Sequence, residues 1–227
     1  MPSSDATHWS TILDAARGER EARDRFARRY EGVVRSYLAA RWRGTPLVSD
    51  VDDATQEVFV DCFRDAGALE RLDPARAPSF RAFLRGVVRN VALRTERNRA
   101  RQKGRPGAAP FEADRLPADD DGLSTVFDRA WARSLLALAA ERQKDLAREQ
   151  GDEALRRVEL LELRFDDGLP IRDIAKQWGV DTTRLHREYA RARREFGRAL
   201  QAVVAEHHPG SREEVRAECL CLLELFG

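Results

Sequence analysis

Apolar residues recur every three or four positions through most of this 227-residue chain, which is the spacing of one face of an α-helix. A first helix is predicted from Phe26, Tyr30, Val33 and Tyr37, and the glycine and proline within residues 44–46 end it. No segment sustains the alternation of apolar and polar residues that a half-buried β-strand requires. The pattern therefore predicts an all-α chain.

Two more helices are predicted in the first half. One runs from Asp50 to Ala66, with acids in its first turn and Cys62 on an apolar stripe that indicates a core position. The next follows Ser79, a residue type that caps helix N-termini. Its apolar residues stop near Leu93, so the polar continuation Arg94–Lys103 is expected either to project beyond the domain or to fray.

The region after this helix separates two helical modules. Residues 106–128 contain three prolines and the acidic run Asp119–Asp121, which predicts a flexible linker. Helical spacing then resumes. We therefore predict an N-terminal module over residues 1–105, a C-terminal module over residues 129–200 and a helical extension over residues 201–227.

Composition narrows the class of protein. Hydrophobic residues at 42% and charged residues at 35% fit a soluble globular chain, and 7% aromatic residues argue against an aromatic-rich β-sandwich or barrel. No apolar run approaches the roughly 18 residues of a membrane span, and the N-terminus lacks a secretory signal. Three cysteines are too few for a disulfide framework. These features predict a cytoplasmic protein with no membrane partner.

The net charge of +1 conceals a strong segregation of charge. Residues 50–73 hold eight acids and two arginines, whereas residues 81–105 hold nine bases and one acid. A second basic block, residues 184–198, holds six arginines and two glutamates. Basic segments suit nucleic-acid phosphates, and the acidic segment suits either a basic protein surface or water.

Residues 171–178 form a short amphipathic segment followed by Gly179 and by Asp181 or Thr182 as a candidate N-cap, which predicts a helix-turn-helix. In the second helix, arginines repeat every three or four residues at Arg184, Arg187, Arg191, Arg194 and Arg198. A solvated charged surface is the alternative interpretation. The preceding helix and turn favour DNA contact.

Two groups of motifs resemble one family. The segments Asp50–Val60 (DVDDATQEVFV) and Phe80–Leu93 (FRAFLRGVVRNVAL) resemble region 2 of sigma-70 family RNA polymerase sigma factors of the extracytoplasmic-function (ECF) type. The segment Leu163–Val180 (LRFDDGLPIRDIAKQWGV) resembles region 4 of the same family. The resemblance covers roughly residues 10–200, with a linker and no region 3 between.

The resemblance implies a subunit that binds core RNA polymerase and directs promoter recognition and transcription initiation, with no catalytic residue, metal or cofactor of its own. It assigns core-polymerase binding to the acidic segment, at Asp50, Asp52, Asp53, Gln56 and Glu57. It assigns contacts with the minus-10 element of promoter DNA to Arg85, Arg89, Asn90 and Arg94. It assigns contacts with the minus-35 element to Thr182, Thr183, Arg184, His186, Arg187 and Arg191. An anti-sigma factor is a further candidate partner.

The sequence departs from the family at three places. Phe83 stands where the family usually has tryptophan, and Glu188 stands where it often has a basic residue. The loop of residues 68–79 has no aromatic residue that could stack on an extruded base. The residues that would capture a flipped minus-10 base are therefore left unassigned.

Other functions remain as alternatives. A helix-turn-helix regulator that acts without polymerase would explain the second basic block but not the acidic segment. A nuclease would need metal-binding carboxylates, and Asp119–Asp121 are clustered but lie in the predicted linker. His207 and His208 with Cys219 and Cys221 are a weak signal for zinc.

The extension has an apolar face behind the candidate N-cap Ser211, and such a short helix needs a partner. We expect it either to pack on the C-terminal module as a fixed extension or to detach, docking between the modules or recruiting a regulator.

Overall fold

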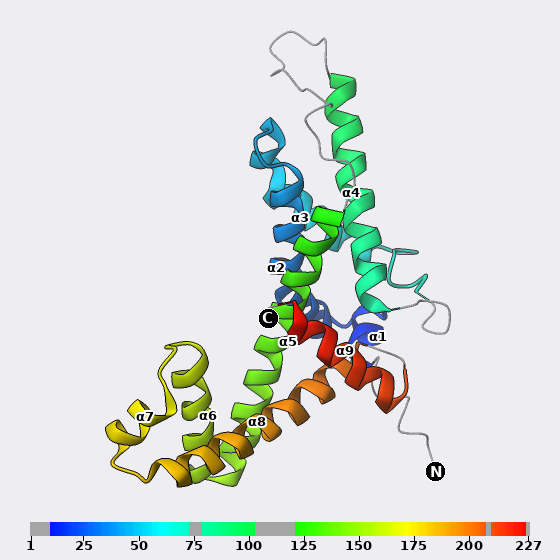
Figure 1. Cartoon of the computed structure of the whole chain (residues 1–227). Coiled ribbons are helices and arrows are strands. Elements are labelled where there is room, and N and C mark those ends of the chain that lie inside the picture. Colours follow the sequence, from blue (N-terminus) through cyan, green and yellow to red (C-terminus); the bar gives the residue numbers. More distant parts are fainter. Residues whose placement is uncertain (1–9, 73–78, 103–120, 208–209, 226–227) are drawn as a thin grey trace, which may run out of the picture. The chain divides into compact units, whose positions relative to one another are not determined.

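The computed structural model describes residues 10–72, 79–102, 121–207 and 210–225, and within these ranges the chain is helical without a β-strand (Figure 1). The all-α prediction is confirmed. The chain forms two compact units. Unit 1 comprises Met1–Ser134 and Ala205–Gly227, and unit 2 comprises Leu135–Val204.

Unit 1 is built around a long central helix, α2, which packs against α1, α3 and α4. Its described elements are α1 (Ser10–Ala16), α2 (Arg20–Arg41), the 3-10 turn η2 (Pro46–Asp50), α3 (Val51–Phe63), α4 (Phe80–Gln102), the start of α5 (Asp121–Gln150) and α9 (Arg212–Glu224). The buried face of α2 carries Phe26, Tyr30, Val33 and Tyr37, so the apolar spacing that predicted this helix also predicted its core side.

An aromatic cluster joins distant parts of unit 1. The rings of Tyr30 and Trp131 stack with centroids 5.5 Å apart, and Phe80 lies beside both. The Tyr30 hydroxyl is hydrogen-bonded to Nε2 of His207 at 2.6 Å. Burial raises the pKa of Tyr30, so its hydroxyl stays protonated. These contacts connect α2, α4, α5 and the segment after α8.

Local sequence accounts for where α4 begins and for the turn that follows α3. The Ser79 hydroxyl accepts a hydrogen bond from the Ala82 amide at 3.1 Å, as the predicted N-cap requires. Helix α3 ends at Phe63, before the predicted limit, and Ala66 adopts a left-handed φ of 53°. The next residue is Gly67, where a Cβ atom would overlap the Arg64 carbonyl oxygen. Only glycine fits this turn without a shift of the backbone.

The last residues of the predicted linker are helical. Residues 106–120 lie outside the described residues, but residues 121–128 form the first turns of α5 and are not linker. Leu123 and Phe127 are buried there. They are four residues apart and so lie on one face of the helix, and their burial stabilises the first turns of α5. The boundary between the units falls within α5, after Ser134.

Unit 2 contains the second part of α5, α6 (Asp152–Phe165), α7 (Ile171–Trp178) and nearly all of α8 (Thr182–Ala205). Its core includes Leu160, Ile174 and Leu185 from three helices. Between α7 and α8, Gly179 adopts the left-handed conformation with φ of 62°. Asp181 then caps α8, because its Oδ1 accepts from the Arg184 amide at 2.8 Å.

Of the predicted extension, residues 205–227 belong to unit 1, so the first of its two expected arrangements, packing on the C-terminal module, is wrong. Ser211 begins α9 with a capping box that it shares with Glu214. The buried side chains of α9 are Val215, Cys219 and Leu222. The sequence showed the apolar face of this helix but carried no signal for which module would cover it.

Candidate nucleic-acid interface

The acidic face of α3 comprises the residues expected to bind polymerase: Asp50, Asp52, Asp53, Gln56 and Glu57. Asp50 is half-buried in η2, and the other four are exposed. Asp52 forms an ion pair with Arg35 of α2, and Glu57 lies 2.8 Å from a guanidinium nitrogen of Arg94 in α4. The face is therefore accessible but partly neutralised by neighbouring helices.

Val60 extends the acidic face and was missed by sequence reasoning. This residue is 55% exposed, so it offers an accessible apolar contact beside the carboxylates of α3. It lies one turn beyond Gln56 and two turns beyond Asp53 on α3, so helical spacing could have identified it.

The first two arginines of α4 are already engaged within unit 1. Arg81 lies 3.4 Å from Glu218 of α9 and 3.8 Å from Asp128 of α5. Arg85, one of the expected minus-10 contacts, donates a hydrogen bond to the Ser124 hydroxyl of α5. The N-terminal part of the basic stripe of α4 therefore contributes to the packing of unit 1.

The accessible basic surface of α4 lies further along the helix. Arg89 and Asn90 are exposed, and Arg94 is half-buried between α3 and solvent. A surface hollow of about 320 Å³ is lined by Asn90, Arg94, Arg97, Asn98 and Arg101. The last three were not assigned as DNA contacts from the sequence, although residues 90, 94, 97 and 101 repeat at helical spacing.

Arg94 is the most constrained of the expected DNA contacts. Its two terminal nitrogens donate hydrogen bonds to Asp61 Oδ2 and Glu57 Oε1, both at 2.8 Å. Asp61 is buried, whereas Glu57 is exposed. A residue expected to bind DNA therefore pairs with a residue expected to bind polymerase.

Glu96 shows that the polar end of α4 is not merely solvated. It is 7% exposed, and its carboxylate accepts hydrogen bonds from Arg41 at 2.6 and 3.1 Å and from the Trp42 indole at 2.9 Å. This buried contact ties α4 to the end of α2. The helix continues without interruption to Gln102, so the expectation of fraying is not met over the described residues.

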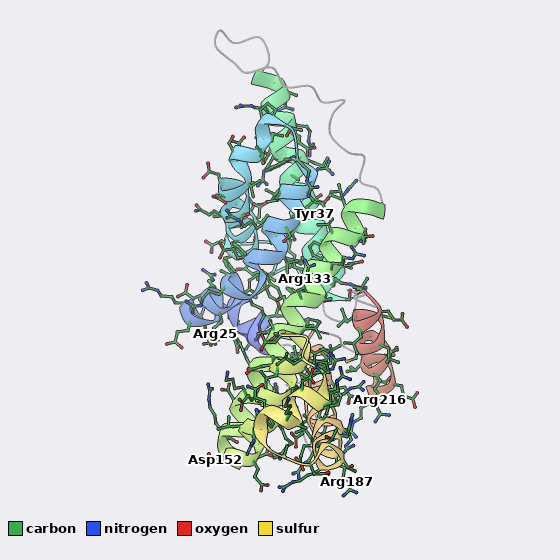
Figure 2. The ribbon with its side chains drawn as sticks, turned by 60° about the vertical axis from the view of Figure 1, so that its left-hand side comes forward. Arg25, Tyr37, Arg133, Asp152, Arg187 and Arg216 are labelled. Carbon is green, nitrogen blue, oxygen red and sulfur yellow. The ribbon has the colours of Figure 1, made fainter. Side chains whose placement is uncertain are left out.

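The outer face of α8 carries every residue expected to read the minus-35 element, and all of them are exposed: Thr182, Thr183, Arg184, His186, Arg187 and Arg191. Figure 2 shows the labelled Arg187 side chain extending outward from the helix. Arg191 forms an ion pair with Glu195 at 3.1 Å. Over the described part of the chain, no carboxylate lies within ion-pair distance of Arg184 or Arg187.

A buried ionic contact fixes α8 against α6. Arg157 is 4% exposed, and its Nε donates to Glu195 at 2.9 Å. Partial burial acts to raise the pKa of Glu195, but the hydrogen bonds and charges of Arg157 and Arg191 outweigh it and hold this pKa below its ordinary value. Glu195 therefore stays ionised and connects the exposed Arg191 to the packed side of α8.

One part of the chain matches a known protein family. Residues 24–102, from α2 to the end of α4, match the family model for sigma-70 region 2. This segment is therefore similar to sigma-70 region 2. The match supports a sigma-70 family sigma factor with a role in promoter recognition. No curated protein is detectably similar to the chain.

The segment that matches sigma-70 region 2 holds both the acidic face of α3 and the hollow along α4. The ion pair between Glu57 and Arg94 thus connects two surfaces of a single domain. Unit 2 lies outside the matched residues, so any role for it depends on the geometry of α6 to α8 and on the resemblance to region 4.

The weak zinc signal has no structural support among the described residues. In these ranges no three histidine, cysteine or acidic side chains gather as metal ligands would, and His208 lies outside them. His207 is bonded to Tyr30 instead. Burial raises the pKa of the Cys219 thiol to about 11 and that of the Cys62 thiol to about 12, so both remain protonated.

No helix in the described part of the chain is both long enough and apolar enough to cross a membrane.

Proposed function

We propose that this protein is an ECF-type sigma factor that binds core RNA polymerase in the cytoplasm and directs it to promoters, without catalysing a reaction itself. The match of residues 24–102 to sigma-70 region 2 is the observation that carries the proposal. The exposed arginines of α8 support it, because they provide a second surface suited to DNA in a separate unit.

Polymerase binds the acidic face of α3 in this proposal. Four of the five residues are exposed, and Asp53 and Gln56 form no ion pair or hydrogen bond within the described residues. A basic helical surface on the polymerase would complement their charge. Val60 would then supply an apolar contact among the charged ones.

The minus-10 element binds along α4 in this proposal. Arg89, Asn90 and Arg94 face the outside of the region 2 domain, and Arg97 and Arg101 continue the same surface. Arg85 contacts DNA only if it gives up its hydrogen bond to the Ser124 hydroxyl. Five potential phosphate contacts over three turns give this helix a sequence-independent affinity for nucleic acid.

The minus-35 element binds at α7 and α8, which we interpret as a helix-turn-helix. The N-terminal turns of the second helix would enter the major groove, where Arg187 and Arg191 can reach base edges. The rigid turn at Gly179 and the cap at Asp181 support this interpretation, because they fix where α8 begins.

The proposal is tested by retention of core RNA polymerase on the immobilised full-length chain. We expect the wild type to retain it and Asp53→Lys with Glu57→Lys to abolish retention. Asp53→Lys alone should weaken retention while leaving the Glu57–Arg94 pair in place. The matched control reverses two exposed charges of α5, Glu141→Lys with Glu149→Lys, and should bind as the wild type does.

Two outcomes contradict the proposal. Normal retention by the Asp53→Lys, Glu57→Lys variant would exclude the α3 face as the docking site. A wild-type chain that binds specific DNA but never retains core polymerase would favour the alternative, a polymerase-independent helix-turn-helix regulator.

A further inference from the structure

Unit 2 contains a cavity of about 180 Å³ between α6, the end of α7 and the first turns of α8. Its apolar lining comes from Leu160, Trp178, Val180 and Leu185, and its charged lining comes from Glu153, Arg156, Arg157, Arg184 and Glu188. Arg184 is the one residue of this lining to which the proposed function assigns a role.

Two consecutive arginines of α6 have opposite environments at this cavity. Arg157 is buried and bonded to Glu195. Arg156 is exposed, and its Cζ lies 4.7 Å from the centroid of the Trp178 ring. No carboxylate within the described residues pairs with Arg156. The tryptophan therefore holds a guanidinium whose charge is not neutralised by an ion pair.

Stacking leaves the hydrogen-bonding edge of Arg156 available. A cation–π contact uses the face of the planar guanidinium, whereas its N–H groups point outward in the plane. Such a fork matches the oxygens of a phosphate group. Trp178 thus restricts the position of Arg156 without consuming its donors, and this preorganisation lowers the entropic cost of binding an anion.

Arg184 provides a second guanidinium on the same cavity, from the first turn of α8. The two carboxylates of the lining do not cancel both cations. Glu188 lies 3.7 Å from Arg157, which also pairs with Glu195, and Glu195 pairs in turn with Arg191. These two carboxylates are therefore offset by two arginines other than Arg156 and Arg184. Glu153 is exposed and is the single acid left beside Arg156 and Arg184.

The cavity adjoins the basic face of α8. At about 100° per residue, Arg184, Arg187 and Arg191 form one stripe. Glu188 and Glu195, which contact Arg157 of α6, lie between that stripe and the core side of α8. Helix α6 therefore flanks the stripe, and Arg156 continues the basic surface beyond α8.

We propose that Arg156, held by Trp178 and assisted by Arg184, binds a backbone phosphate of promoter DNA beside the groove that α8 enters. This role rests on the proposed DNA-binding function of unit 2. A phosphate contact at this position adds affinity and fixes the register of α8 on the duplex, but it carries no sequence information.

The test uses holoenzyme assembled from the full-length chain and two DNA probes of equal length. One probe is a promoter fragment recovered with the holoenzyme, and the other is a mixed-sequence duplex. Apparent Kd is measured for each over a series of salt concentrations. We expect Arg156→Ala to weaken binding several-fold on both probes and to reduce the slope of log K against log salt by about 0.9, the value for one phosphate contact.

Arg193→Ala is the matched control. Arg193 is also an exposed arginine of unit 2 on an aromatic ring, with its Cζ 5.8 Å from the Tyr189 centroid, but helical geometry places it away from the arginine stripe. Its removal should leave the salt slope unchanged. Arg156→Lys should retain the slope and lose part of the affinity, because it keeps the charge but lacks the planar fork. Trp178→Leu should lower the affinity for both probes, because it removes the ring that holds Arg156. Its thermal unfolding is measured alongside, because Trp178 also packs against the core of unit 2.

Arg187→Ala separates this inference from the proposed function. If Arg156→Ala matches Arg193→Ala while Arg187→Ala still weakens promoter binding, the phosphate contact is wrong and the DNA-binding role of α8 stands. If Arg187→Ala also has no effect, the DNA-binding role itself fails. A loss confined to the promoter probe would show that Arg156 reads a base, and a loss of polymerase retention would show that the cavity binds protein; either result overturns the proposal.

Discussion

The two basic helices of this protein, α4 and α8, have similar compositions but differ in how their charges are engaged. In α4, Arg81, Arg85 and Arg94 all contact polar or acidic side chains of α3, α5 or α9. In α8, Arg184 and Arg187 have no such partner within the described residues. The outward charge of α8 is available, whereas much of the charge of α4 is shared with its own domain.

This difference predicts different thermodynamic roles. A phosphate that meets an unpaired arginine gains the full electrostatic contribution of that charge, including counterion release. A phosphate that meets a paired arginine must displace a carboxylate first, so its net gain is smaller. Charge counts along the sequence treat both helices alike, and only the contacts distinguish them.

The largest expected effect concerns the acid that α4 buries. Glu96→Ala would leave the guanidinium of Arg41, which is 4% exposed, without its carboxylate. Removing one member of a buried ion pair typically destabilises a protein by roughly 3–5 kcal/mol. We expect a loss of that size in the free energy of unfolding of unit 1, measured by urea denaturation of the full-length chain.

The double variant Glu96→Leu with Arg41→Met provides the control. Replacing both charges by apolar side chains should recover much of the lost stability, because no uncompensated charge remains buried. If Glu96→Ala lowers the free energy of unfolding by less than about 1 kcal/mol, the Arg41 guanidinium must be hydrated in the variant. The pairing of charges in α4 would then contribute little to the stability of unit 1.

A smaller effect on folding but a clear effect on binding is expected for α8. Arg187→Ala should leave the free energy of unfolding within about 0.5 kcal/mol of the wild type, since the residue is exposed and unpaired. If Arg187 contacts a base edge, promoter affinity should fall by about 1–3 kcal/mol with altered sequence preference. Fluorescence anisotropy with promoter fragments measures this.

Arg191→Ala compares a paired arginine of α8 with the unpaired Arg187. Arg191 shares Glu195 with the buried Arg157, so its removal alters a packed network as well as the outer surface. We expect a binding loss comparable to that of Arg187→Ala together with a measurable change in melting temperature. Wild-type transcription by both variants would contradict the recognition role of α8.

Local sequence was sufficient for the helices and for the exposed stripe of α8. Apolar spacing predicted α2, the helix-turn-helix pattern predicted α7 and α8, and the caps at Ser79 and Asp181 form as residue type suggested. Long-range pairings could not be predicted, because a single sequence does not show which distant residues meet. Arg81 and Glu218 pair across more than a hundred residues. Nothing in the sequence of α9 indicated which part of the chain would cover its apolar face.

The smallest expected effect tests whether pairing limits the use of α4. Glu57→Gln removes one of the two carboxylates that hold Arg94 while keeping the side-chain shape. The free energy of unfolding should change by less than about 1 kcal/mol, because both partners are substantially exposed. The salt-dependent affinity of the full-length chain for DNA, measured without polymerase, should rise by a factor of a few, because a phosphate no longer competes with Glu57 for Arg94.

Asp52→Asn is the control that distinguishes loss of the Glu57–Arg94 pair from a change in net charge. It removes the same charge from the same acidic face, but Asp52 pairs with Arg35 of α2 and not with α4. An equal rise in DNA affinity for both variants would be an effect of net charge alone. A rise confined to Glu57→Gln would mean that polymerase and DNA act on opposite ends of one ion pair. Because linkage is reciprocal, a polymerase that engages Glu57 would then release Arg94 for DNA, and DNA that engages Arg94 would strengthen polymerase binding by the same factor.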